Sequence, residues 1–163
     1  MAALPADVTV TEILPGSAEG QAMLTAFFRD IVRRSSGREP TVREVDAEMR
    51  KDPSDDLRSP TGLFFVARQG AAVVGCIGLR LMPDGIGEVT RVYVDPAARG
   101  AGIGGVLMRT VEDEARDREL SMLRLDTRTE LAEARRLYAR HGFQPTAPFN
   151  DGWADLWFEK PLR

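Results

Sequence analysis

The sequence predicts an α/β fold built around one mixed β-sheet that is flanked by helices. Three strand-like segments separated by short turns, between Leu63 and Val94, predict an antiparallel meander. A helical pattern follows, with Leu107, Val111 and Ala115 at positions i, i+4 and i+8. Another strand-like segment comes next, and such a strand-helix-strand crossover makes its two strands parallel. Together with the terminal segments, this predicts a mixed, mostly antiparallel sheet of six or seven strands.

The segment before the meander is predicted to hold one strand and two helices. Residues 8–13 alternate apolar and polar side chains, which predicts the first strand. Ser17 ends the next turn and is typical of a helix N-cap. Thr41 stands three residues before Glu44, the spacing of a capping box, and starts a second, more polar helix. The first helix carries apolar residues at helical spacing, namely Met23, Leu24, Phe27, Phe28 and Ile31.

The remaining elements follow from the same patterns. Gly142 is well placed to end the last helix. The chain is expected to close with a pair of strands, at residues 146–149 and 154–160. The strands of the meander and crossover are expected at residues 63–68, 72–82, 88–94 and 122–127, and the last helix at residues 131–143.

Length and composition predict a single globular domain over residues 1–163. No apolar run approaches the ~20 residues that a membrane span needs, so no membrane association is expected. The N-terminus lacks a basic region followed by a long apolar stretch, which favours a cytoplasmic protein. The net charge of −3 provides no field that would attract DNA or RNA, so nucleic acid is not expected as a partner.

The sequence contains one cysteine and one histidine, and this limits the chemistry available to it. Cys76 lies in an apolar strand and is expected to be buried, with no disulfide partner. A lone histidine disfavours zinc sites and Ser-His hydrolysis, so no metal is expected. His141 is expected at a helix C-terminus, interacting with the helix dipole and not serving as a ligand. Catalysis is therefore expected to use carboxylates, tyrosine and backbone groups.

A glycine-rich segment before the crossover helix is typical of a pyrophosphate-binding loop. Backbone N–H groups at a helix N-terminus attract anions, and glycines let phosphate oxygens approach closely. Gly100, Gly102 and Gly105 spell the dinucleotide pattern G-x-G-x-x-G, and Asp126 follows at about the distance of a ribose-binding acid. Against a dinucleotide fold, residues 95–99 lengthen the turn, and only about 58 residues follow Gly105. A P-loop is disfavoured because no Lys-Ser/Thr pair ends the segment.

Two motifs in this region resemble those of the GNAT superfamily of N-acyltransferases. Residues 92–104, VYVDPAARGAGIG, are similar to its acyl-CoA-binding motif, Gln/Arg-x-x-Gly-x-Gly/Ala. Residues 137–143, LYARHGF, are similar to its second motif, Leu-Tyr-x-x-x-Gly-Phe. The order of elements also resembles that of the family over nearly the whole chain. One departure is Leu131, which stands where many members carry an asparagine, so a side-chain contact to the cofactor is expected to be absent.

The resemblance implies acetyl-CoA as co-substrate and a splayed pair of parallel strands, residues 88–94 and 122–127. The pantetheine arm would lie between these strands, and a backbone N–H at or near Val94 would polarise the thioester carbonyl. Arg99 and the N–H groups of the glycine loop would hold the pyrophosphate. The cofactor contacts implied in this way are Val92, Tyr93, Val94, Arg99, Gly100, Ala101, Gly102, Ile103, Gly104 and Gly105.

Acyl transfer to an amine needs a base for the ammonium and an acid for the departing thiolate. Tyr138 is interpreted as the acid; the alternative is a core tyrosine on the apolar side of its helix. Glu88 is interpreted as the base, acting directly or through water; the alternative is a solvated carboxylate at a strand end. Asp126 is a second candidate base, although a cap or turn role is favoured for it.

By family resemblance, the acceptor pocket is expected from the first helices and the last loop, with Phe27, Phe28, Phe149 and Trp153 as lining residues. Asp151 or Asp155 would attract a cationic amine, whereas Arg34, Arg38 and Arg43 would favour an acidic acceptor. The expected function is N-acetyl transfer to a primary amine of a small molecule or peptide, by direct attack in a ternary complex. The alternative is a non-catalytic acyl-CoA sensor on the same fold, and a homodimer is plausible by family analogy.

Overall fold

The computed structural model describes residues 7–163 and forms one seven-stranded sheet in the order β1-β2-β3-β4-β5-β7-β6. All neighbouring strands are antiparallel except β4 and β5, which are parallel. This confirms the predicted mixed sheet. The strands are β1 Val8–Glu12, β2 Gly62–Gln69, β3 Ala72–Met82, β4 Ile86–Val94, β5 Met122–Thr127, β6 Gln144–Pro145 and β7 Leu156–Pro161; the helices are α1 Ala18–Ser36, α2 Val42–Lys51, α3 Ile103–Asp117 and α4 Ala132–Arg140, with short 3₁₀ turns at Pro83–Gly85 and Pro96–Ala98.

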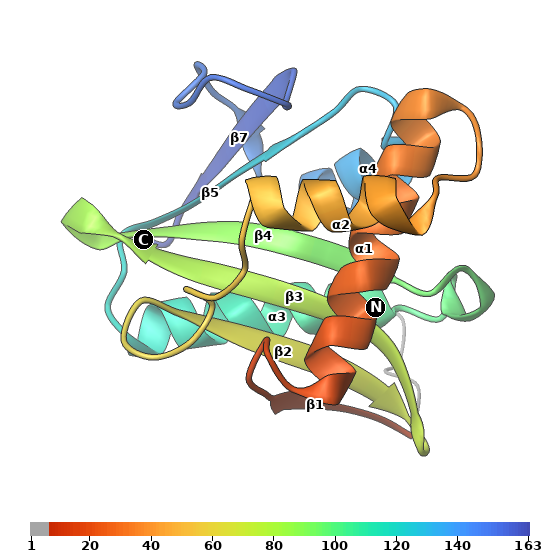
Figure 1. Cartoon of the computed structure of the whole chain (residues 1–163). Coiled ribbons are helices and arrows are strands. Elements are labelled where there is room, and N and C mark those ends of the chain that lie inside the picture. The colour runs from red at the N-terminus through yellow and green to blue at the C-terminus, as the bar shows by residue number, and fades with distance from the viewer. Residues whose placement is uncertain (1–6) are drawn as a thin grey trace.

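The helices lie on the two faces of the sheet, with α1 and α2 on one face and α3 and α4 on the other (Figure 1). Under α3 and α4 lies the larger apolar core, which includes the fully buried Leu107, Val111 and Ala115. Under α1 lies a smaller core around Leu24 and Cys76. The predicted burial of Cys76 is confirmed, and burial raises the pKa of its thiol to about 12.

The predicted helix starts in the N-terminal half are confirmed by their capping contacts. The Ser17 hydroxyl accepts a hydrogen bond from the Gly20 N–H over 3.1 Å, which satisfies one free donor of the first turn of α1. Thr41 and Glu44 form the expected capping box at the start of α2. These caps fix where the two helices begin and so which face of α1 meets the sheet.

The parallel pair β4 and β5 separates after a short stretch of pairing. Their register covers three positions and ends with Glu88 opposite Arg124. Beyond that point β5 pairs only with β7, along its full length, and β4 pairs only with β3. A bulge at Arg91, whose φ is +57°, bends β4 just past the point of separation. The splayed strand pair implied by the family resemblance is therefore present.

The predicted last strand pair is wrong in its extent. The strand expected at residues 146–149 is a loop, because β6 covers only Gln144–Pro145. Pro148 has no N–H to donate, so the pairing with β7 cannot continue through it. One further hydrogen bond joins Thr146 to Trp157, and β7 begins at Leu156. Within residues 7–163, none of the helices has both the length and the apolar character to cross a membrane.

Candidate active site

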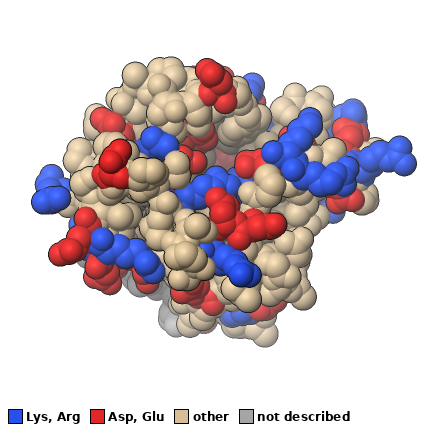
Figure 2. All heavy atoms as spheres, turned by 60° about the vertical axis from the view of Figure 1, so that its left-hand side comes forward, with Lys and Arg blue, Asp and Glu red and all other residues tan. Residues whose placement is uncertain are grey.

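A cavity of about 1360 Å³ opens where β4 and β5 separate. Its walls come from β4, α1, α3, α4, the end of β5 and the loop around residues 150–154, so every layer of the fold contributes to it. Figure 2 shows a face of the molecule on which acidic and basic side chains are mixed around a hollow. Nearly all the residues that the sequence suggested for the cofactor line this cavity; Ala101 instead packs against the larger core.

The backbone of β4 presents free hydrogen-bonding groups to the cavity. Asp95 donates its N–H to Val74 on β3, and Val94 is directly opposite Gly75. In an antiparallel ladder, this register turns the N–H and C=O of Val94 away from β3 and toward the gap left by β5. The Val94 carbonyl accepts a hydrogen bond from Arg99 Nε over 2.9 Å.

The glycine loop ends in an uncapped helix N-terminus that faces the same cavity. Gly100 and Gly102 have φ values of +88° and +83°, a conformation that other residues rarely adopt. The first hydrogen bond inside α3 runs from the Val106 N–H to the Gly102 carbonyl. The N–H groups of the preceding helical residues, Ile103 to Gly105, therefore have no partner within the helix and are positioned to bind an anion.

Arg99 lies within a network of charges that joins α1 to α4 across the cavity. Its guanidinium is 3.7 Å from Asp30 and 3.9 Å from Glu133. Arg34 pairs with the same two carboxylates. Arg34 is thus occupied within the protein, as is Arg38, which pairs with Glu44. The acidic acceptor considered from Arg34, Arg38 and Arg43 stays a prediction.

Tyr138 is a core residue that also borders the cavity. It lies on α4, is 5 % exposed, and its ring packs against Phe143 with 6.1 Å between centroids, so it belongs to the core. It also lines the cavity. Burial, reinforced by the negative charges of Asp126 and Glu133, raises the pKa of Tyr138 well above its ordinary value. The phenol is therefore a neutral O–H donor throughout the physiological pH range.

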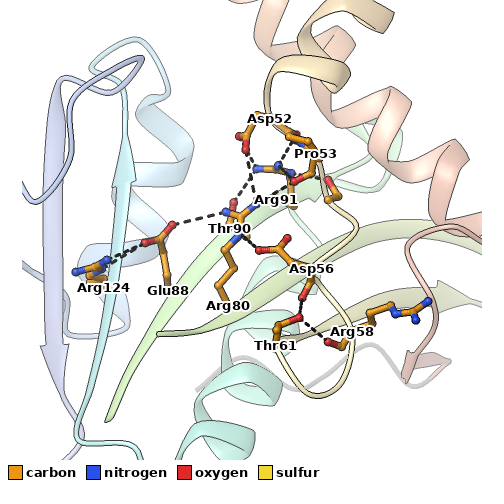
Figure 3. Close-up of polar contacts among 11 residues, drawn as sticks. Asp52, Pro53, Asp56, Arg58, Thr61, Arg80, Glu88, Thr90, Arg91 and Arg124 are labelled. Atoms are coloured by element: carbon orange, nitrogen blue, oxygen red, sulfur yellow. Dashed lines mark hydrogen bonds and ion pairs between the residues drawn. The ribbon is translucent and has the colours of Figure 1, made fainter. Parts of the chain in front are cut away.

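Glu88 is held between two arginines at the point where the strands separate (Figure 3). Its Oε2 accepts hydrogen bonds from Arg124 Nη2 and Nε over 3.2 and 3.3 Å. Its Oε1 lies 3.6 Å from Arg80 Nη1, beyond ordinary hydrogen-bond length. The side chain is 18 % exposed and lines the cavity, so Glu88 is not a freely solvated carboxylate.

Asp126 is neither a cap nor a turn residue, so that interpretation is wrong. It lies within β5, opposite Trp157 on β7, and lines the cavity. Asn150 donates a hydrogen bond to the Asp126 carboxylate over 2.7 Å, and the Trp157 indole donates to the Asn150 carbonyl over 3.0 Å. The C-terminal loop thereby orients Asp126, which the sequence did not indicate.

Comparison with known proteins identifies the family. Residues 26–143 match the model of the Acetyltransferase (GNAT) family, which is well over half of the chain. The chain belongs to this family. It is 42 % identical over 110 residues to an IAA acetyltransferase of Azospirillum brasilense, a match that covers 65 % of this chain and 72 % of that protein.

Solved structures agree with this assignment. A crystal structure from Klebsiella pneumoniae, assigned to the acyl-CoA N-acyltransferases, is 32 % identical and has a TM-score of 0.75, covering 98 % of this chain and all of that one. The fold is also shared with the PaiA N-acetyltransferase of Thermoplasma acidophilum in complex with coenzyme A, with 20 % identity, a TM-score of 0.73, and coverage of 94 % and 98 %. GNAT acetyltransferases use acetyl-CoA as acyl donor, and the glycine loop and free β4 edge described above fit such a ligand.

The residues that the sequence suggested for the acceptor pocket differ in their relation to the cavity. Phe149 lies with its ring over the guanidinium of Arg124, at 4.2 Å, and does not line the cavity itself. Trp153 is 42 % exposed at the rim and lies over Arg128. Asp155 accepts hydrogen bonds from the N–H and hydroxyl of Thr129, so it serves as a loop anchor. Asp151 lines the cavity.

Arg91 is a component of this GNAT site that the sequence reasoning missed. Its side chain is 3 % exposed and donates hydrogen bonds to Ser54 and to the Asp52 carbonyl, over 3.1 and 2.9 Å. It also pairs with the Asp52 carboxylate at 3.1 Å. Phe27 and Phe28 lie 5.7 and 4.9 Å from its guanidinium carbon. The two phenylalanines therefore cover Arg91 as well as lining the cavity, and Arg91 ties α1 and the loop after α2 to the bulge of β4.

Two further features bear on the cofactor and on metals. Leu131 is the N-cap of α4 and makes no side-chain capping bond, as its apolar side chain requires. Among residues 7–163, no group of three or more His, Cys, Asp or Glu side chains is arranged to hold a metal ion. His141 ends α4 as expected, and burial and nearby cations lower its pKa.

Proposed function

We propose that this chain transfers an acetyl group from acetyl-CoA to a primary amine of a small molecule or peptide, by direct attack in a ternary complex. The observation that carries the proposal is the separation of β4 and β5 beyond Glu88 and Arg124. The separation opens a cavity with an anion-binding helix terminus on one wall and with Tyr138, Asp126 and Glu88 around it. Donor and acceptor can therefore occupy the same cavity together.

The donor would be held by backbone groups of β4 and of the α3 N-terminus. The free N–H groups at the start of α3 would bind the pyrophosphate, and the edge of β4 around Val94 would bind the pantetheine arm. Acetyl-CoA supplies the activated thioester. The Val94 N–H would stabilise negative charge on the reacting carbonyl oxygen, an interaction whose loss costs roughly 3 kcal/mol in comparable sites. Arg99 would give up its hydrogen bond to the Val94 carbonyl and bind the pyrophosphate instead.

Glu88 is the proposed base. One of its carboxylate oxygens is bound by Arg124, while Oε1 lies beyond hydrogen-bond distance of Arg80, and the residue lines the cavity. That oxygen can accept a proton from the ammonium, directly or through a water molecule. Asp126 is the alternative base; like Glu88, it has one carboxylate oxygen that accepts a hydrogen bond, in this case from Asn150.

Tyr138 is the proposed acid. A phenol that stays neutral retains the proton that the departing thiolate needs. A phenol whose pKa is raised is a weaker acid, but the burial that raises it would also raise the pKa of a thiol in the same place. The proton transfer therefore stays feasible, and protonation prevents the thiolate from returning to the new amide.

The test is release of free thiol from acetyl-CoA across a panel of primary amines, run beside thermal-shift measurements. Acetyl-CoA at about 100 times its Kd is expected to stabilise the fold by ~2.7 kcal/mol, and NADH is expected not to. Turnover with at least one amine supports the transferase. Stabilisation by acetyl-CoA without turnover on any amine would favour the acyl-CoA sensor, and stabilisation by NADH alone would overturn both.

A further inference from the structure

Three basic side chains line the part of the cavity beside the glycine loop, and the proposed reaction does not use them. Arg109 belongs to α3, while Arg140 and His141 end α4; all three line the cavity. A Cβ atom placed on Gly105 would lie 3.3 Å from Arg109 Nη1 and 3.6 Å from His141 Nε2. These two nitrogens therefore converge on one point above the first turn of α3, next to its free N–H groups.

The structure pairs the arginines of this cluster with no carboxylate in the part of the chain that it describes. Within residues 7–163, neither Arg109 nor Arg140 has a carboxylate within 4.0 Å. Glu112, the acid whose charge acts on His141, is bound by Lys160 and by Arg116. By contrast, the other arginines of the cavity, Arg80, Arg91 and Arg99, are each paired with carboxylates. An unneutralised guanidinium pair facing a cavity fits an anionic ligand.

The pKa of His141 is affected by the same excess of positive charge. Burial lowers its pKa, and so do the cations that face it: Arg109 from α3, Lys160 from β7 and its neighbour Arg140. Glu112 acts in the opposite direction, but more weakly than Arg109. In the free protein His141 is thus neutral at pH 7.5. A dianion placed among these groups would reverse the balance and favour the imidazolium.

We propose that Arg109, Arg140 and His141 form a phosphomonoester-binding subsite that receives the 3′-phosphate of coenzyme A. This assignment rests on the proposed function, because it takes the donor to be a coenzyme A thioester. The phosphomonoester is a separate group from the pyrophosphate, and its dianion matches two guanidinium groups and one imidazolium. Gly105 is part of the subsite because any larger residue would fill the point on which Arg109 and His141 converge.

The experiment compares binding of coenzyme A with that of 3′-dephospho-coenzyme A by titration calorimetry, which requires no turnover. The wild type is expected to bind coenzyme A at least tenfold more tightly. The double variant R109A/R140A should bind the two compounds about equally, with its Kd for the dephospho compound the same as that of the wild type. The matched control is R136A, an exposed arginine on the same helix that does not line the cavity and should leave the ratio intact. G105A should lower the ratio without removing a charge.

A second measurement is specific to His141. At pH 7.5 a phosphomonoester is already almost fully dianionic, so a proton taken up on binding goes to a group of the protein and not to the phosphate. Titrations in two buffers with different ionisation enthalpies should show proton uptake with coenzyme A, less with the dephospho compound, and none with either in H141Q. Equal affinities for the two compounds in the wild type would overturn the subsite alone. If the two compounds bind equally and inorganic phosphate binds tightly, the cluster is a site for free phosphate. If neither coenzyme A nor the dephospho compound binds, the proposed function itself is overturned.

Discussion

Glu88 and Arg124 are both the last paired residues of β4 and β5 and partners in an ion pair of 3.2 Å. The pair therefore lies at the point where the two strands separate, and it holds a carboxylate at the edge of the cavity. Arg124 is in turn covered by the ring of Phe149 from the C-terminal loop. This arrangement links the position of the proposed base to the geometry of the sheet.

The first prediction concerns the base. Replacing Glu88 by Gln keeps its shape and some of its hydrogen bonds but removes its capacity to accept a proton. We expect kcat/KM to fall by about 10²- to 10⁴-fold, as is usual for loss of a general base, with the Kd for acetyl-CoA unchanged. Asp126→Asn is the matched control and should reduce kcat/KM much less. The reverse ranking of the two variants would make Asp126 the base.

The second prediction concerns the acid. Tyr138→Phe should lower kcat by about 10²-fold. Because the pKa of Tyr138 is raised, its ionisation should cause no loss of wild-type activity below about pH 10. The measurement is kcat against pH for both proteins, with acetyl-CoA binding as the check on folding. An unchanged kcat in the variant would remove Tyr138 from the mechanism and leave it as a core residue.

The third prediction concerns Arg91 as a positioning residue. Arg91→Lys retains the charge but loses the set of hydrogen bonds to Ser54 and the Asp52 carbonyl. We expect the free energy of unfolding to fall by about 3 kcal/mol in urea denaturation, because buried polar partners lose their donor. We also expect KM for the amine to rise more than KM for acetyl-CoA, since Phe27 and Phe28 lie on this guanidinium. Arg136→Lys, on the exposed face of α4, should change neither quantity.

The fourth prediction concerns Cys76 and pH. Burial raises the pKa of this thiol to about 12, compared with about 8.5 in an unfolded chain. The native protein binds this proton more tightly, so the contribution to stability is complete below about pH 8.5 and is lost as pH rises toward 12. Stability measured by urea denaturation should fall over this range, and less steeply in Cys76→Ala.

The same burial predicts that the Cys76 thiol reacts slowly with thiol reagents. A thiol-specific reagent at pH 8 should label the native protein far more slowly than the protein in denaturant, because the thiolate is scarce and the sulfur is inaccessible. Rapid labelling of the native protein would contradict the burial described for β3.

The helices and strands could be predicted from the sequence more fully than the contacts of the candidate site. Helix starts at Ser17 and Thr41 were predictable because a cap is a contact between residues three apart. The first strand of the last pair was predicted too long, because apolar alternation does not show where a proline ends the pairing of two strands. Asp126 was misinterpreted for a related reason: its partner Asn150 comes from a loop whose position depends on β7.

The sequence by itself determined the order of elements, the glycine loop and the two motifs that resemble the GNAT superfamily. These are local features, set by turn chemistry and by the period of apolar residues along a few turns or strands. Tertiary structure alone decided that Glu88 lies between Arg80 and Arg124, that Arg91 is buried in a bulge, and that Arg109 and His141 both approach Gly105. These contacts join segments from different elements, and they depend on strand register and helix packing, which no local pattern specifies.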